Sequence, residues 1–281
     1  MANHMSSIGF LMQTDDDFYR YAMQAVENGE HFGAEGTFII GYPKEGYIGD
    51  RTYVRWGVGG GAELWAQVNQ DNELTGLHPH FSGDAVMRVG LTARVERPEE
   101  NELDGAFHGW ADPNPDGGNP ESGAYPFVFD APDYVLHEAV ELPAVFDVQL
   151  AAFAHELNAY ASDEEYYASR PGEIKFASES FIPSGLFISG GEPDNPPQSY
   201  AIFAGHVLGT SLLINPATGA KFHWAKVRTL GGEVDVVADL GMLNGSLIVG
   251  GVVEGSFWLS GLLLGRPKAK REGFRNRLFN S

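Results

Sequence analysis

The sequence predicts an α+β fold that is mainly β. It begins with a mixed N-terminal domain that opens β-α-β-β-β, and a small OB-like antiparallel β-barrel domain follows. Residues 200–265 alternate short apolar runs with glycine-rich turns, which is the rhythm of a small closed sheet. The 36 glycines among 281 residues fit many tight turns. One amphipathic helix is predicted near the N-terminus, after Thr14.

The opening elements follow from local signals. Residues 7–13 alternate weakly between apolar and polar side chains, which predicts a strand. Thr14 then has the properties of a helix N-cap, with Asp17 three residues on as a variant of the capping box. Gly29 is the predicted end of this helix. Because His4-Met5 is what a common cloning site encodes, we expect Met5 to be the native first residue.

The remaining elements are mostly strands. Those of the N-terminal half are predicted over residues 37–42, 52–58, 62–68, 85–96, 103–110 and 125–129, and a strand pair lies in 174–188. Three glycines at 59–61 predict a hairpin turn. Residues 145–160 fit both a strand and a helix, and we favour a strand followed by a helix over 163–169 that is capped by Ser162.

The predicted domains are residues 5–190 and 199–265, followed by a basic tail over 266–281. Residues 190–197, GGEPDNPP, have the composition of a linker between them. Within the first domain, SIGFLMQTDDDFYRYAMQAVENG resembles the opening strand and helix of glyoxalase-type (vicinal oxygen chelate) modules, and GAELWAQV resembles their closing strand. This resemblance implies a metal-dependent enzyme. Glu63 matches one of the family's ligands, whereas Ser7 or Ile8 stands where the family usually has another.

Charge and composition narrow the class of protein. The net charge is −20, and residues 1–198 carry 33 acidic and 9 basic side chains. Such an acidic region disfavours binding to nucleic acid. The absence of cysteine excludes disulfides and thiolate metal sites. Since no apolar run is long enough to span a bilayer, we expect a cytoplasmic protein without a membrane span.

Two groups of residues are candidate sites for a divalent metal. Asp112, Asn114 and Asp116 follow the first half of a calcium-loop pattern, although Gly123 stands where an EF-hand has its bidentate glutamate. His78 and His80 with Glu63 form a candidate zinc site, since neutral imidazoles and a carboxylate bind that metal. Pro79 between the two histidines predicts a loop. The alternatives are a solvated acidic turn and a pair of structural histidines.

The most distinctive run of the C-terminal part is KFHWAKVR. On a strand, Phe222, Trp224, Lys226 and Arg228 share one face, and aromatic rings beside cations are typical of surfaces that bind single-stranded nucleic acid. The alternative is that both rings point into the core while the cations extend to solvent.

No complete catalytic constellation is found in the sequence. His108, His137 and His155 are scattered, and no nucleophile is placed beside any of them. We therefore expect a non-catalytic binding or interaction protein with a protein or small-molecule partner. The alternatives are a metal-dependent enzyme or metal-binding protein that uses calcium or zinc, and a nucleic-acid-associated protein.

Overall fold

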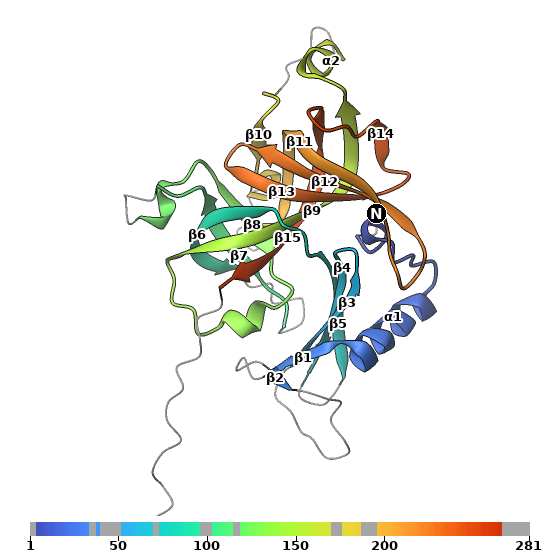
Figure 1. Ribbon diagram of the computed structural model, residues 1–281. Coiled ribbons are helices and arrows are strands. Elements are labelled where there is room, and N and C mark those ends of the chain that lie inside the picture. The colour runs from blue at the N-terminus through green and yellow to red at the C-terminus, as the bar shows by residue number, and fades with distance from the viewer. Residues whose placement is uncertain are drawn as a thin grey trace, which may run out of the picture.

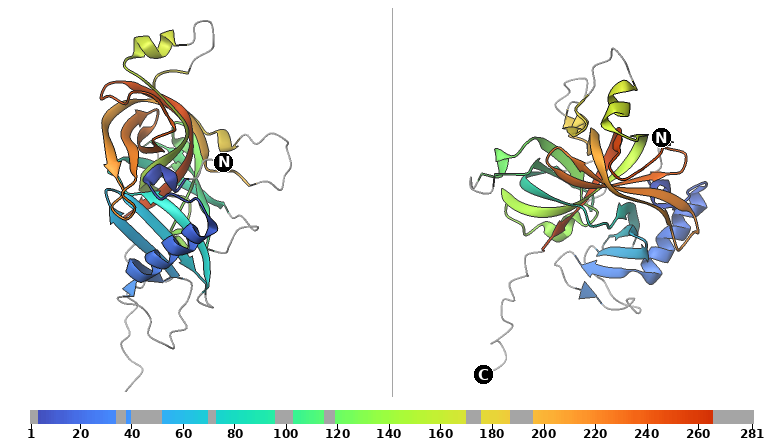
Figure 2. Two further views of the ribbon diagram at one scale, coloured as in Figure 1. Left: turned by 90° about the vertical axis from the view of Figure 1, so that its right-hand side faces the viewer. Right: turned by 45° about the horizontal axis from the view of Figure 1, so that its top comes forward.

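The computed structural model describes residues 4–33, 38–39, 52–69, 73–95, 103–114, 119–169, 176–186 and 196–265. The predicted mainly-β class is confirmed, because two β-sheets make up most of this part of the chain (Figure 1). Helix α1 lies along the smaller sheet, and the larger sheet curls into rings above it (Figure 2). Among these residues, no helix is long and apolar enough to cross a membrane.

The predicted first helix is confirmed as α1 (Asp15–Asn28), which ends at Gly29. The backbone N–H of Thr14 donates to Asp17 Oδ2 at 2.9 Å, so the aspartate satisfies an otherwise unpaired donor before the first turn. The hydrogen bonds that the Asp17 carboxylate accepts from the backbone of Gln13 and Thr14 hold its pKa below the ordinary value.

The predicted strand over residues 7–13 is wrong, because this segment contains a 3₁₀ helix, η1 (Ser6–Ile8). Gly9 follows in the left-handed region at φ +80°, which turns the chain. The carbonyls of Ile8 and Gly9 accept from the side chains of Asn215 and Thr218 at 2.8 and 2.7 Å. The turn that contains Asn215 and Thr218 thus supplies hydrogen bonds that a neighbouring strand would otherwise supply. Residues 7–13 therefore do not form the opening strand of a glyoxalase-type module.

Within the described residues, the smaller sheet has five strands in the order β2-β1-β3-β4-β5. They are β1 (Glu30–Gly33), β2 (Phe38–Ile39), β3 (Thr52–Gly59), β4 (Ala62–Val68) and β5 (Leu74–Phe81). The predicted strands over 52–58 and 62–68 are confirmed, and all three glycines of their hairpin have positive φ. The loop predicted at His78-Pro79-His80 is wrong, because these residues lie within β5. A proline is tolerated there since β5 is at the edge of the sheet.

The larger sheet closes twice on itself. Its strands are β6 (Val86–Val95), β7 (Ala106–Ala111), β8 (Pro126–Asp130), β9 (Ala144–Tyr160), β10 (Ser180–Ile182), β11 (Tyr200–Ile214), β12 (Lys221–Thr229), β13 (Gly232–Asp239), β14 (Leu243–Gly245) and β15 (Val252–Leu264). The path β11-β12-β13-β9-β15 closes because β15 also pairs with β11. The path β9-β15-β8-β7-β6 closes because β6 also pairs with β9. Two five-stranded rings therefore share β9 and β15.

Strand β9 confirms the choice of a strand for residues 145–160. It runs for 17 residues and pairs antiparallel with β15 from Asp147 to Tyr160. Residues 199–265 supply β11, β12, β13 and β15. Strand β9, which lies in the predicted first domain, completes their ring. The predicted domain boundary stays a prediction, since residues 187–195 lie outside the described part.

Two predictions between β9 and β11 have different outcomes. The short helix is confirmed as α2 (Asp163–Ala168), in which the Glu165 N–H donates to Ser162 Oγ. The strand pair predicted over 174–188 is wrong within the described residues 176–186. These contain only β10 and a 3₁₀ turn, η4 (Ser184–Leu186). Pro183 ends the strand because it has no N–H, and its carbonyl accepts from Leu186 at 3.0 Å.

A column of aromatic rings fills the space enclosed by the rings of strands. Tyr125 stacks on Phe181 with ring centroids 4.6 Å apart, and Phe181 stacks on Phe203 at 5.5 Å. Phe203 and Phe257 are parallel at 3.9 Å. This aromatic column connects side chains from both halves of the chain, and Phe203 lies in its middle.

The stability of the α2 end of the molecule is expected to depend on pH through His206. Its Nε2 lies 3.1 Å from Asp163 Oδ2, and its Nδ1 lies 2.9 Å from Glu179 Oε1. Partial burial lowers the pKa of His206, but hydrogen bonding and attraction by the two carboxylates outweigh it, and the net shift is upward. The resulting stabilisation is complete below the unfolded pKa of about 6.5 and is lost as pH rises through the folded pKa.

An NMR titration of the His206 imidazole tests this expectation, with a midpoint above that of a denatured control. The melting temperature of the unsubstituted protein is expected to fall between pH 6 and pH 8. In the His206→Gln variant this contribution to the fall is expected to be absent. A midpoint below the denatured value would contradict it.

Candidate functional site

The candidate site lies between the five-stranded sheet and the rings. Strand β4 is buried on both faces. Leu64 and Ala66 pack with the residues of α1, whereas Trp65 belongs to the core within the rings. The alternation of a strand places Glu63 and Gln67 on the same face as Trp65. The face of the small sheet that meets the rings is therefore rich in polar side chains.

The three predicted zinc ligands lie on this polar face. Glu63 is directly opposite His80 in the β4–β5 register, and Trp65 is opposite His78. Each of the three has another partner. Arg55 Nε donates to Glu63 Oε2 at 2.9 Å, and His78 Nε2 lies 2.7 Å from Asp104 Oδ1. Within the described residues, no group of three or more His, Asp or Glu side chains is placed to hold a metal ion.

His80 is fully buried in a chain of hydrogen bonds between the two sheets. Its Nε2 lies 2.7 Å from Gln149 Oε1, and Gln149 Nε2 donates to Asp235 Oδ2 at 3.0 Å. The Gln149 oxygen therefore faces His80 and accepts from Nε2–H. The Nδ1 atom is then left to accept from Ser260 Oγ at 2.9 Å. Burial lowers the pKa of His80, in keeping with a neutral ring.

Asp235 ends this chain and is inaccessible to solvent. Besides Gln149, its carboxylate accepts from Trp224 Nε1 at 2.8 Å and from the Ala85 N–H at 3.0 Å. Burial is the main cause that raises its pKa. The sequence does not indicate Ser260, Gln149 or Asp235 as site residues. The available signal is a single polar residue within an apolar strand, as in LSG, VQL and VDV.

Ser260, His80 and Gln149 are in the order of a nucleophile, a base and an orienting group. Ser260 lines a cavity of about 220 Å³. The charged groups on the wall of that cavity include Asp104 and Asp130, whereas acyl transfer requires hydrogen-bond donors for a developing oxyanion. This arrangement favours a structural role for the chain of hydrogen bonds.

A second and larger cavity, of about 480 Å³, is lined by Gln149 of this chain of hydrogen bonds. We call it the Trp65 cavity. Its wall includes apolar side chains, among them Phe32, Val86 and Leu263, and Gln149 also lines it. The ring of Phe32 stacks against Trp65 with centroids 5.9 Å apart. Its volume lies within the range of small-molecule sites, about 300–1,000 Å³.

Trp65 lines this cavity and carries a buried polar group without a partner in the described part of the chain. Its side chain is 1% exposed, and Nε1 has no hydrogen-bond partner among the described residues. A buried donor without a partner costs about 1–3 kcal/mol. The guanidinium of Arg55 lies 5.8 Å from the centre of the Trp65 ring and pairs with Glu63, which raises the pKa of Arg55.

The residues of the predicted calcium loop are only partly described. Asp112 and Asn114 are exposed, and Asp112 has a positive φ of 48°. The backbone N–H of Asn114 donates to Ser122 Oγ at 3.0 Å. Asp116 lies outside the described residues, so the calcium prediction stays a prediction.

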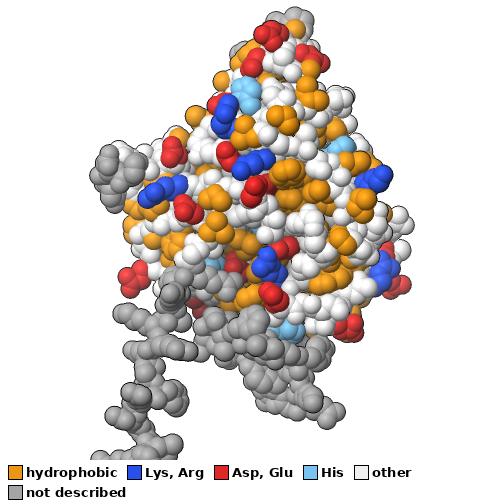
Figure 3. Space-filling model, viewed as in Figure 1, with side chains coloured by type: hydrophobic (Ala, Val, Ile, Leu, Met, Phe, Trp, Pro, Cys, Tyr) orange, Lys and Arg blue, Asp and Glu red, His pale blue; other side chains and the backbone are white. Residues whose placement is uncertain are grey.

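The strand β12 has its aromatic residues at the joint between the sheets. Phe222 is fully buried and meets Phe81 edge-on, and Trp224 lies over the same ring at 6.4 Å. The cations are paired, because Lys226 Nζ lies 2.8 Å from Glu233 and Arg228 Nε lies 2.8 Å from Glu179. On the face seen in Figure 3, basic side chains are scattered among acidic ones.

Comparisons of this chain with protein-family models, curated proteins and solved structures found no match.

Proposed function

We propose that this protein is a non-catalytic, cytoplasmic binding protein that holds a small organic molecule in the Trp65 cavity. Two observations support the proposal: Trp65 lines a cavity of about 480 Å³, and its indole N–H is buried without a partner among the described residues. A ligand with a hydrogen-bond acceptor satisfies this donor and removes the cost of leaving it unpaired.

The lining of the Trp65 cavity indicates the chemistry of the ligand. Phe32 and Trp65 offer aromatic surface, and Val86 and Leu263 offer aliphatic surface, which suits a planar, mostly apolar molecule. The charge of Arg55 is matched by Glu63, and Glu30 and Asp133 add carboxylates to the wall. The ligand we propose is therefore neutral or cationic, with one acceptor for the Trp65 N–H.

The fold proposal is that β11, β12, β13 and β15 form an OB-like ring with β9 as its fifth strand. This ring supports the site from one side, because Gln149 on β9 and Leu263 on β15 both line the Trp65 cavity.

The Trp65→Phe variant is expected to bind 6-propionyl-2-dimethylaminonaphthalene about 3- to 10-fold more weakly than the unsubstituted protein. This probe is neutral and planar, and its one carbonyl accepts a hydrogen bond. The expected loss corresponds to one hydrogen bond. Probe fluorescence measures the dissociation constant.

Trp56→Phe is the matched control, because Trp56 is on the neighbouring strand and lines neither cavity. It is expected to leave the affinity unchanged. Circular dichroism checks that both variants fold. Equal affinity of the two folded variants, or no binding of the probe to the unsubstituted protein, would count against the proposal.

A further inference from the structure

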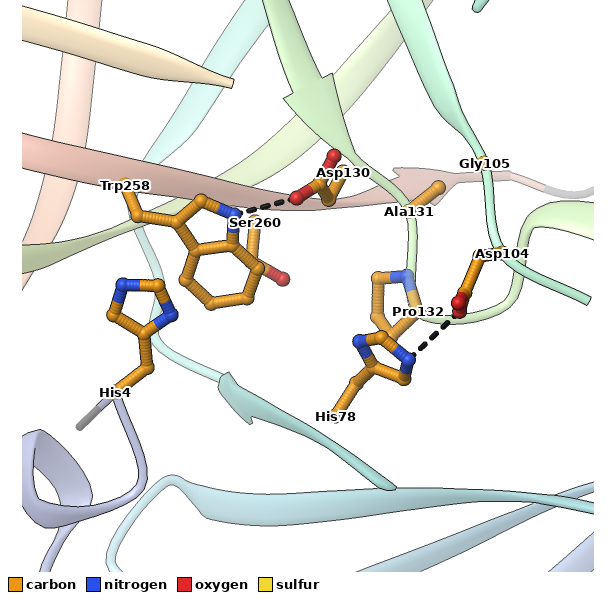
Figure 4. A pocket seen from close by; sticks show the side chains of 9 residues that line it. All are labelled: His4, His78, Asp104, Gly105, Asp130, Ala131, Pro132, Trp258 and Ser260. Carbon is orange, nitrogen blue, oxygen red and sulfur yellow. Dashed lines mark hydrogen bonds and ion pairs between the residues drawn. The ribbon is translucent and has the colours of Figure 1, made fainter. Parts of the chain in front are cut away.

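The imidazole ring of His4 lies between Trp258 and His155, beside the smaller cavity. We call the space between Trp258 and His155 the slot. The imidazole of His4 lies parallel to the indole of Trp258, with centroids 4.3 Å apart and planes 4° apart (Figure 4). Its Nε2 lies 2.7 Å from Nε2 of His155, and the planes of these two rings differ by 8°. His4 is thus held by its face on Trp258 and by its edge on His155.

The contact between the two histidines requires that one ring be neutral at the contacting nitrogen, so that this nitrogen accepts from the N–H of the other ring. Burial lowers the pKa of His4 to about 4, with further lowering by His155 and His78. Burial also lowers the pKa of His155. At neutral pH, His155 can therefore donate to a ring nitrogen or accept from a ring N–H. The slot is suited to a nitrogen heterocycle, since it offers a stacking surface and an in-plane partner.

The smaller cavity extends the slot beyond the His4 ring. It holds about 220 Å³ and separates His4 and Trp258 from His78 and Pro132 (Figure 4). Asp104 and Asp130 place carboxylates on its wall. A carboxylate has about four acceptor positions, so both can accept from a ligand in addition to their protein partners. This wall favours a ligand with an amino group and disfavours an anionic one.

We propose that Trp258 and His155 form a binding slot for a free amino-substituted purine base. The His4 ring, which precedes the expected native start at Met5, occupies the slot in this chain as a stand-in for that base. The five-membered ring of a purine is an imidazole, so it takes the place of His4 between the same two partners. The six-membered ring and its amino group then reach the cavity that Asp104 and Asp130 line. This site is separate from the Trp65 cavity and goes beyond the function proposed above.

Titration calorimetry with adenine tests the slot in the full chain. The His4→Ala variant is expected to bind adenine at least tenfold more tightly than the unsubstituted protein, because the competing ring is gone. The His4→Ala/His155→Phe double variant keeps a ring at position 155 but has no nitrogen there. It is expected to bind adenine about tenfold more weakly than His4→Ala. Hypoxanthine, which has a carbonyl in place of the amino group, is expected to bind His4→Ala more weakly than adenine does.

The same experiment separates this proposal from the previous one. Binding of the naphthalene probe to the Trp65 cavity is expected to be the same in all three proteins, and the melting temperature reports that each is folded. The proposal of a purine slot would be overturned if the folded His4→Ala variant failed to bind adenine, or bound it no more tightly than the unsubstituted protein. An unchanged affinity in the double variant would also overturn it. The amino-group preference would be overturned by equal binding of hypoxanthine.

Discussion

Replacing Asp235 by alanine is expected to lower the free energy of unfolding by about 3–5 kcal/mol, because it leaves several buried donors without an acceptor. These donors are Trp224 Nε1, Gln149 Nε2 and the Ala85 N–H, at 2.8–3.0 Å from the carboxylate. The loss also frees Gln149, which orients His80.

Urea unfolding followed by circular dichroism measures this effect. Asp84→Ala is the matched control, because Asp84 is next to Ala85 in the sequence and its side chain is 80% exposed. Its ion pair with Lys226 is a long contact of 3.7 Å between Oδ1 and Nζ. Exposed pairs of this kind contribute about 0–1 kcal/mol. Trp224→Phe should fall between the two, since it removes one donor and leaves the carboxylate with the others. A loss below 1 kcal/mol in Asp235→Ala would show that the network does not hold the sheets together.

The Phe203→Ala variant is expected to lose about 3–5 kcal/mol of unfolding free energy in a single transition. Phe203 is 1% exposed and stacks on Phe257 and Phe181 within the aromatic column. Removing its ring leaves a cavity between Phe181 of the predicted first domain and Phe257 of the second, which cannot collapse without moving β10 or β15. Phe203→Leu should lose less, about 1–2 kcal/mol, since it keeps most of the volume.

Differential scanning calorimetry provides the test, because it resolves separate unfolding events. Ile202→Ala is the control at the adjacent position, where the side chain points outward and is 38% exposed. If Phe203→Ala split the thermogram into two peaks of which only one moved, residues 5–190 and 199–265 would be independent domains. One peak that moves as a whole supports a single cooperative unit.

The parts of the fold that the sequence predicts well are those that depend on near neighbours. Helix α1 follows from Thr14, Asp17 and Gly29, which act within one or two turns. The hairpin at residues 59–61 follows from glycines that adopt positive φ. By contrast, η1 depends on Asn215 and Thr218, more than 200 residues away in the chain. No local pattern indicates that contact.

The candidate site shows the same limit. The sequence indicates a site that includes Glu63 and His80, and these two residues are opposite each other in the β4–β5 register. However, the partners that determine the chemistry of His80 are Gln149 and Ser260, which come from β9 and β15. The packing of these strands against the small sheet is a long-range property. Periodicity shows only that a polar residue interrupts an apolar strand, not which group it meets.

The ladder shared by β9 and β15 also limits how this protein can change over evolution. Both strands belong to both rings, so a shift of one residue in their register would turn the inward side chains of the two rings outward together. Single-residue insertions are therefore tolerated in the turns at the ends of these strands rather than within them. Gln149 lines the Trp65 cavity and Ser260 lines the smaller one, and both residues are on this ladder. The register of the ladder therefore fixes the spacing between the two cavities.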